Sequence, residues 1–203
     1  MTAAQRPTRH LDLGCGAVPR NPYRRDEAHG IDIALPAGVD TRLFRSANLA
    51  VEPIPHADSS FDSISAFDFI EHVPRVLQTP DGRGTRFPFV ELMGEIHRVL
   101  EPDGLFYAVT PAWPRVEAFQ DPTHVNVLTE GTAGYFCGAD PGARAYGYRG
   151  RFEMLRNDWA LHPEAFDPTT PLTPMRRFKR WQRGVRGRLT HLVWEFRCIK
   201  PVE

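Results

Sequence analysis

The chain has 203 residues, of which 41% are hydrophobic and 25% charged, and its formal net charge is zero. This length suits one domain with a sizeable core, and the neutral charge argues against a partner selected by a strong overall field. No apolar run approaches the roughly 18 residues of a membrane span, and the first ten residues contain no secretory apolar region, so we expect a cytoplasmic protein. Three scattered cysteines without a Cys-x-x-Cys pair argue against a disulfide framework or a cysteine zinc site.

The first half of the chain contains strand signals separated by loops. Prolines within 17–28 permit only a short or broken helix there, and alternating prolines make 51–56 a loop. An Asp-Gly-Arg-Gly turn lies within the loop 74–88. Strands are predicted at 10–13, 30–33, 41–49 (weakly) and 61–67.

A helix follows, because Phe89, Met93, Ile96 and Leu100 form one apolar stripe. Glu101-Pro102-Asp103-Gly104 ends this helix. Later strands are predicted at 105–110, 152–155 and 192–199. The alternation of strands and helices predicts an α/β fold with an open, mainly parallel sheet of seven strands, which binds ligands outside the carboxyl ends of its strands.

A glycine turn follows the first strand, in Leu11-Asp12-Leu13-Gly14-Cys15-Gly16. Glycine lets the backbone turn sharply and approach a ligand closely. Asp32 ends the second strand, 16 positions beyond Gly16, and can accept hydrogen bonds from both ribose hydroxyls of a nucleoside. A dinucleotide site requires a third glycine before an intact helix, and here that position is Pro19. A nicotinamide dehydrogenase is therefore the weakest of the alternatives.

The glycine turn resembles the first motif of S-adenosylmethionine (SAM)-dependent methyltransferases. Later motifs of that family follow in order over 11–111, about half of the chain: Asn48-Leu49, Pro53-Ile54-Pro55, Ser59-Ser60-Phe61-Asp62, Phe69-Ile70-Glu71-His72-Val73 and Glu95 to Gly104. By this resemblance the chain is identified as a class I methyltransferase of the methyltransferase-11-like domain family. The resemblance implies one Rossmann-like domain over 1–203, with a mainly parallel seven-stranded sheet flanked by helices. SAM carries no phosphate, so it does not need the helix that is missing after the turn.

The resemblance also implies a set of cofactor residues: Asp12, Gly14, Cys15, Gly16, Asp32, Ile33, Asn48, Leu49 and Phe67. The glycine turn would line the methionine end of SAM, and Asp32 would bind the ribose. Asn48 and Leu49 would flank the adenine, and Phe67 would lie near the sulfonium. Asn48 stands where the family usually has Asp, but its amide oxygen can still accept from the adenine amino group.

Candidate catalytic residues follow the fourth strand. In one helical turn, Asp68, Glu71 and His72 would share a face, and His124 could reach the same crevice. Two carboxylates and two imidazoles suit a divalent metal that lowers the pKa of a substrate hydroxyl. The pattern resembles the ubiquinone-biosynthesis O-methyltransferases and the small-RNA 3′-terminal 2′-O-methyltransferases, which have Glu where this chain has Asp68. Alternatively, His72 or His124, together with Glu71, serves acceptor contact or general-base chemistry without a metal, or the group braces the crevice.

The acceptor is the least determined part of the prediction. The sequence Asp121-Pro122-Thr123-His124 resembles bacterial methyltransferases of polysaccharide and secondary-metabolite pathways, which implies O-methylation of a small hydroxylated acceptor. Loops 74–88 and 113–150, the second rich in aromatic residues, are candidate lids. Two alternatives stay open: metal-assisted methylation of an RNA 3′ end, and a SAM-binding protein without catalysis. The sequence leaves the oligomeric state open.

A basic segment lies in the connection 165–190 between the last two strands. Residues 176–188 hold seven basic side chains and no acid. Such a segment can bind nucleic acid, a phosphorylated sugar or an anionic lipid surface, or it can be a solvated connection. The neutral overall charge weighs against nucleic acid, although a local patch can still bind phosphates.

Overall fold

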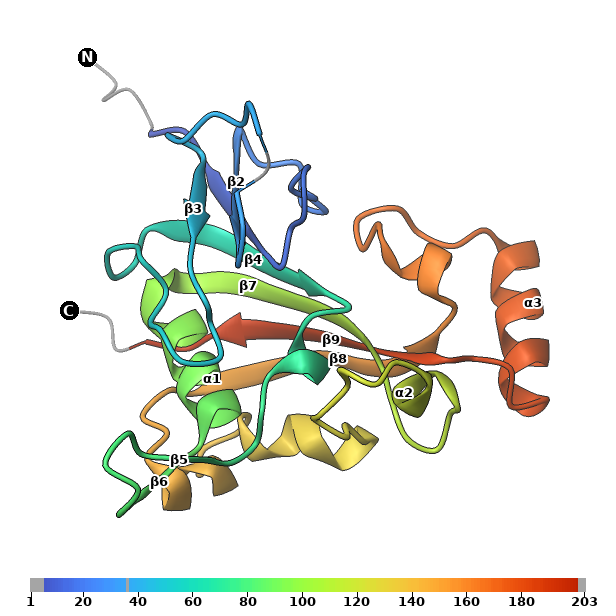
Figure 1. Cartoon of the computed structure of the whole chain (residues 1–203). Coiled ribbons are helices and arrows are strands. Elements are labelled where there is room, and N and C mark those ends of the chain that lie inside the picture. Colours follow the sequence, from blue (N-terminus) through green and yellow to red (C-terminus); the bar gives the residue numbers. More distant parts are fainter. Residues whose placement is uncertain (1–5, 36, 201–203) are drawn as a thin grey trace.

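A computed structural model describes residues 6–35 and 37–200. Its main feature is a seven-stranded sheet (Figure 1), as predicted. In spatial order the strands are β3 (Phe44–Ser46), β2 (Glu27–Asp32), β1 (Arg9–Leu13), β4 (Phe61–Phe67), β7 (Leu100–Pro111), β9 (His191–Cys198) and β8 (Phe152–Ala160). The first five are parallel, and β9 runs antiparallel to both β7 and β8. Among the helices of residues 6–35 and 37–200, none combines the length and the apolar character of a membrane span.

The longer helices are α1 (Pro88–Val99) and α3 (Pro174–Val185). Shorter elements are the hairpin β5 (Leu77–Gln78) and β6 (Thr85–Arg86), the helix α2 (Glu117–Gln120), and the 3₁₀ helices η1 (Ile70–His72), η2 (Glu130–Tyr135), η3 (Gly142–Tyr146) and η4 (His162–Ala165). Helix α1 forms where the apolar stripe predicts it and buries Phe89, Met93 and Ile96. Its stripe ends one residue early, because Leu100 already belongs to β7.

The two faces of the sheet are covered differently. On one face α1 and the segment 128–148 pack against the strands and form the larger core. On the other face Phe67, Tyr107 and Val193 form a smaller core with Tyr23 and Phe166. The Tyr107 hydroxyl donates to the Ala165 carbonyl at 2.7 Å, so η4 is fixed to this second face.

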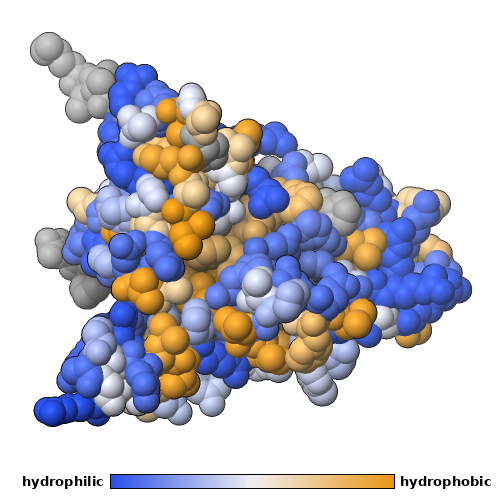
Figure 2. Space-filling model, in the orientation of Figure 1, coloured by the Kyte–Doolittle hydropathy of each residue, from blue (hydrophilic) through white to orange (hydrophobic). Residues whose placement is uncertain are grey.

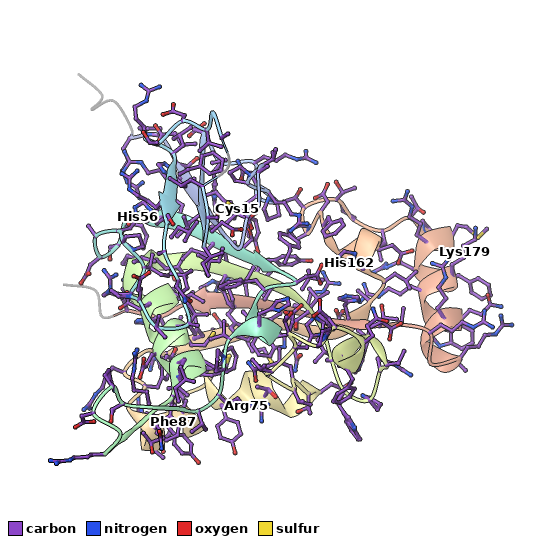
Figure 3. All side chains as sticks on the ribbon, viewed as in Figure 1. Cys15, His56, Arg75, Phe87, His162 and Lys179 are labelled. Carbon is purple, nitrogen blue, oxygen red and sulfur yellow. The ribbon has the colours of Figure 1, made fainter. Side chains whose placement is uncertain are left out.

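The basic connection contains the helix α3, which was not predicted from the sequence. Thr173 caps its start by accepting a hydrogen bond from the Arg176 amide at 3.3 Å. No residue of α3 is buried; two arginines hold it to the body, Arg180 through Asp158 at 2.9 Å and Arg183 through Glu164 at 2.9 Å. The surface around α3 is largely hydrophilic, with single hydrophobic residues interspersed (Figure 2). Figure 3 places Lys179 of α3 at one end of the molecule and His162 between this helix and the sheet.

The predicted site residues lie at one edge of the sheet, at the carboxyl ends of its parallel strands. Because β1, β2 and β4 are parallel, Gly14 and Asp68 follow carboxyl ends at this edge, and Asp32 is the last residue of β2 there. The antiparallel β9 begins here, since His191 pairs with Pro111 of β7. Ligand-binding groups from distant parts of the sequence therefore meet at a single edge.

Candidate functional site

The turn after β1 is built around two glycines with positive φ. The amides of Gly14 and Cys15 both donate to the Ile31 carbonyl, at 2.9 and 3.1 Å, which ties the turn to β2. Gly14 has φ +65°, and a Cβ there would lie 2.6 Å from Cδ2 of Phe69. Gly16 has φ +59° with open space above it, since a Cβ would meet no atom within 4 Å. The turn thus leaves room for a ligand at Gly16, which fits the backbone approach that SAM requires.

Asp12 lies beneath this turn in a buried polar network. It accepts a hydrogen bond from the Ser65 hydroxyl at 2.5 Å and one from the Arg20 amide at 2.8 Å. Ser65 also contacts Nε2 of the buried His10 at 2.8 Å. Burial raises the pKa of Asp12 to about 6, against the lowering effect of these hydrogen bonds. Asp12 therefore joins the segment after the turn, at Arg20, to β4.

Asp32 lies beside the turn at the end of β2. Its Oδ2 accepts from the Gly16 amide at 2.8 Å, and its Oδ1 accepts from the Ile33 amide at 2.7 Å. Each carboxylate oxygen has a further lone pair, so the group can still accept one hydroxyl proton per oxygen. Ile33 is 67% exposed and supplies apolar surface next to it. This geometry suits a ribose with its base alongside.

The other predicted cofactor residues have varied surroundings. Asn48 is exposed, and its side-chain oxygen accepts from the Ala50 amide at 3.2 Å. Leu49 and Phe67 are buried, Leu49 in the larger core and Phe67 in the smaller one. The guanidinium of Arg20 lies 4.8 Å from the centre of the Phe67 ring. Cys15 is also buried, and burial raises the pKa of its thiol to about 12, so it stays protonated.

Glu71, His72 and His124 come together beside the carboxyl ends of β4 and β7, as predicted. The rings of His72 and His124 meet edge to face with centres 4.8 Å apart. Nε2 of His124 lies 4.0 Å from Oε1 of Glu71. The backbone holds the two segments together, since the Glu71 carbonyl accepts from the amides of Val125 and Asn126 at 3.0 and 2.9 Å.

The protonation of this group follows from its surroundings. Glu71 is 1% exposed, and burial raises the pKa of its carboxyl to about 8, although the Thr110 hydroxyl donates to Oε2 at 3.0 Å. Nδ1 of His72 lies 3.0 Å from the Thr123 hydroxyl and 3.3 Å from the Thr123 carbonyl, and Nδ1 of His124 lies 3.3 Å from the Ala118 carbonyl. The Thr123 hydroxyl already donates to Asp121 at 2.6 Å, and a carbonyl only accepts, so these contacts favour the tautomer with the proton on Nδ1 and a lone pair on Nε2.

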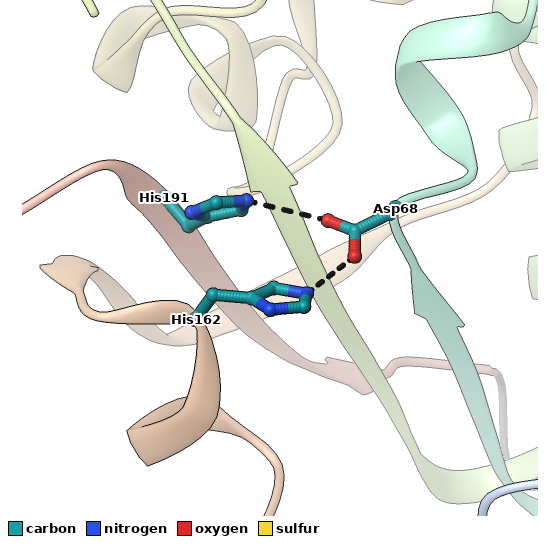
Figure 4. Close-up of side chains that lie close together, drawn as sticks. All are labelled: Asp68, His162 and His191. Carbon is teal, nitrogen blue, oxygen red and sulfur yellow. Dashed lines mark hydrogen bonds and ion pairs between the residues drawn. The ribbon is translucent and has the colours of Figure 1, made fainter. Parts of the chain in front are cut away.

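The prediction that Asp68 shares a site with Glu71, His72 and His124 is wrong. Asp68 does not join these residues, because the helical turn that would align them does not begin at Asp68. Asp68 has φ +48°, and the short η1 starts only at Ile70. Its carboxylate instead lies between His162 and His191 (Figure 4), so the structure divides the predicted four-residue metal site into two groups.

Neither partner of Asp68 was predicted from the sequence. His162 begins η4 and His191 begins β9, and neither lies in a motif. His162 Nε2 contacts Oδ2, and His191 Nε2 lies 3.4 Å from Oδ1. Burial works to raise the pKa of Asp68, but hydrogen bonding to His191 and the charges of both imidazoles hold it below its usual range.

Comparison with known proteins identifies the family. Residues 11–108 match the family model described as a methyltransferase domain, which spans the glycine turn, Asp32 and the Glu71-His72 pair. The chain is a SAM-dependent methyltransferase. No curated protein sequence matches it.

Solved structures agree on the fold of this methyltransferase. One similar chain comes from the Haloferax volcanii complex between the Trm112 methyltransferase activator and a methyltransferase (14% identity, 96% of this chain and 84% of that chain, TM-score 0.55). Another is the SAM-dependent methyltransferase from Mesorhizobium loti (16% identity, 94% of this chain and 91% of that chain, TM-score 0.51). A third is the [4+2]-cyclase SpnF (16% identity, 97% of this chain and 76% of that chain, TM-score 0.51). These likenesses show the fold alone, and one of these proteins is named for different chemistry.

Proposed function

We propose that this methyltransferase transfers the methyl group of SAM to a hydroxyl oxygen of a small, sugar-like acceptor. The tautomers of His72 and His124 support this proposal most directly. With Nδ1 facing a carbonyl, each ring keeps a basic Nε2 at the edge where the SAM turn lies. A hydroxyl is a weak nucleophile until a base takes its proton, so a base at this edge favours transfer to oxygen.

The reaction balances with these groups. The acceptor oxygen attacks the methyl carbon, the carbon–sulfur bond breaks, and its electron pair stays on sulfur, giving S-adenosylhomocysteine. The hydroxyl proton passes to Nε2 of His72 or His124. Glu71, kept neutral by burial, supports the pair without adding a competing negative charge.

The cofactor is proposed to lie along the turn, with Asp32 on the ribose, Ile33 and the segment around Asn48 near the adenine, and Phe67 under the sulfonium end. An exposed aromatic residue supports a ring-shaped acceptor: Trp113 follows β7 closely and is 55% exposed. Loops 74–88 and 113–150 remain the proposed lids, and the hairpin of the first lies beside the start of α1 (Figure 1).

Release of S-adenosylhomocysteine with a panel of acceptors tests the proposal. The panel holds hydroxylated rings and sugars, amines, thiols and an RNA oligonucleotide. Turnover with hydroxylated small molecules is expected, and His72→Gln or His124→Gln should lower kcat by about 10²–10⁴-fold with unchanged SAM affinity. His97→Gln, on α1, should not change the rate. Turnover only on amines, thiols or RNA, or SAM binding without turnover on any of them, would contradict it.

A further inference from the structure

Asp68, His162 and His191 form a second cluster outside the group proposed as the base. They come from three strand ends that lie far apart in the sequence: Asp68 follows β4, His162 follows β8, and His191 begins β9. Figure 4 shows both imidazoles directed at the carboxylate, each at a different oxygen. One ligand atom from each residue lies within 4.8 Å of the other two.

We propose that Asp68, His162 and His191 bind one divalent transition-metal ion, through a carboxylate oxygen of Asp68 and Nε2 of each histidine. One carboxylate and two imidazoles, which bind metal in the neutral form and release any proton on Nε2 when the ion binds, are a ligand set that suits Mn²⁺, Fe²⁺, Co²⁺ or Zn²⁺. Three protein ligands leave coordination positions open for a substrate oxygen.

The details of Asp68 support a ligand role. Its Oδ1 is buried, and it faces Nε2 of His191 at 3.4 Å without a close hydrogen bond from any described residue, so that oxygen keeps a lone pair for an ion. Its backbone has φ +48°, a conformation that few non-glycine residues adopt, and its amide donates to the Val109 carbonyl at 2.9 Å. This left-handed turn carries the side chain away from Glu71 and towards the start of β9. Local strain of this kind concentrates at functional sites.

Contacts around both histidines fix the orientation of their rings. Nδ1 of His191 contacts the Thr190 hydroxyl at 2.8 Å, which orients the ring and leaves Nε2 for the cluster. The His162 ring packs edge to face on Phe166 with centres 4.6 Å apart, and the two imidazole rings lie 4.7 Å apart. The side chains of Asp68 and His162 are 35% and 34% exposed, so an ion and a substrate oxygen can reach them.

Glu71, His72 and His124 are the competing site. Oε1 of Glu71 is also buried without a hydrogen bond from the residues that the structure describes, but the side chain is 1% exposed, its carboxyl group already accepts the Thr110 hydroxyl, and Oε1 lies 4.0 Å from Nε2 of His124. That arrangement leaves less access for an ion than the cluster at Asp68. An ion at Asp68 would lie at the same sheet edge as the SAM turn, where it would hold the acceptor oxygen. This role in the reaction rests on the proposed function, but metal binding by the cluster does not.

Calorimetric titration of the full chain, first freed of metal with a chelator, tests the proposal with Mn²⁺, Co²⁺ and Zn²⁺. One ion per chain is expected to bind. His162→Ala and His191→Ala should each weaken metal binding by at least about 100-fold. Loss of a residue that only hydrogen-bonds a metal ligand weakens binding by up to about 100-fold, and loss of the ligand itself should weaken it at least as much. The visible spectrum of the Co²⁺ form should change in both variants. His72→Ala and His124→Ala are the paired controls and should bind the ion as the wild type does.

The proposal is overturned if the wild type binds no ion, if the His162 and His191 variants bind as the wild type does, or if only the His72 and His124 variants lose binding. Thermal unfolding without metal confirms that each variant is folded, and His191→Gln replaces His191→Ala if the smaller side chain destabilises the fold. SAM affinity should be unchanged in the His162 and His191 variants, so loss of the ion and loss of the cofactor site are measured separately.

Discussion

Replacing Glu71 by glutamine should change how the stability of the protein depends on pH. The side chain is 1% exposed, and burial raises the pKa of its carboxyl from 4.5 to about 8. Between these values the native protein keeps a proton that the unfolded chain releases, so the free energy of unfolding falls as the pH rises. The stabilisation is fully present below pH 4.5 and is lost as the pH passes 8. Glutamine has nearly the same shape, can still accept the Thr110 hydroxyl, and does not titrate.

The size of the effect follows from the pKa shift. Each pH unit within the window lowers the free energy of unfolding by about 1.4 kcal/mol, with a ceiling of about 5 kcal/mol over the whole shift. Asp12, whose pKa burial raises to about 6, contributes in the same direction at lower pH in both proteins. The buried His10, His56 and His97, whose pKa values burial lowers, contribute in the opposite direction, also equally in both proteins. The difference between the two proteins from pH 6 to 8 therefore isolates Glu71. Across it the wild type should lose about 2–3 kcal/mol relative to Glu71→Gln.

Urea unfolding followed by tryptophan fluorescence at pH 6, 7 and 8 measures this difference. Glu117→Gln, which removes one carboxyl from α2 outside the cluster, serves as the control and should follow the wild-type slope. Parallel curves for the wild type and Glu71→Gln would mean that Glu71 is ionised in the native protein, and the burial argument would be wrong.

Two further substitutions test the glycine turn and the packing of α1. Gly14→Ala places a Cβ 2.6 Å from the Phe69 side chain and should lower the free energy of unfolding by about 1–3 kcal/mol, measured by thermal unfolding. Gly16→Ala, whose Cβ meets open space, should lower it less. The reverse order would contradict this description of the turn. Arg98→Met removes the ion pair to Glu95 at 2.7 Å and two hydrogen bonds to backbone carbonyls at 2.9 Å. The free energy of unfolding should fall by about 2–3 kcal/mol. An unchanged midpoint of thermal unfolding would contradict a stabilising role for Arg98.

The parts of the fold that depend on local pattern could be predicted from the sequence. Strand β4 has the predicted bounds, and α1 lies where the apolar stripe places it. The glycine turn and Asp32 could be found because a motif fixes their spacing. Helix α3 was missed because its apolar residues do not pack on a core, although Thr173 and Pro174 at its start are a recognisable cap signal.

The division of the predicted metal site depends on information that the sequence does not contain. A residue pattern at i, i+3 and i+4 indicates a shared face only if the backbone is helical, and the left-handed φ of Asp68 breaks that condition. His162 and His191 reach Asp68 through the antiparallel ending of the sheet, which brings together residues 94 and 123 positions away. Such contacts follow from topology rather than from spacing along the chain.

Calorimetric titration of SAM into the wild type and Asp32→Ala tests the central claim most directly, that the turn at Gly14–Gly16 and the acid after β2 form a SAM site. The wild type should bind SAM, and Asp32→Ala should weaken binding by at least about tenfold, because both ribose contacts and the support of the Gly16 amide are lost. Asp140→Ala, which removes an exposed carboxylate paired with Arg144, should leave the affinity unchanged. An unchanged affinity in Asp32→Ala, or no SAM binding by the wild type, would contradict the claim.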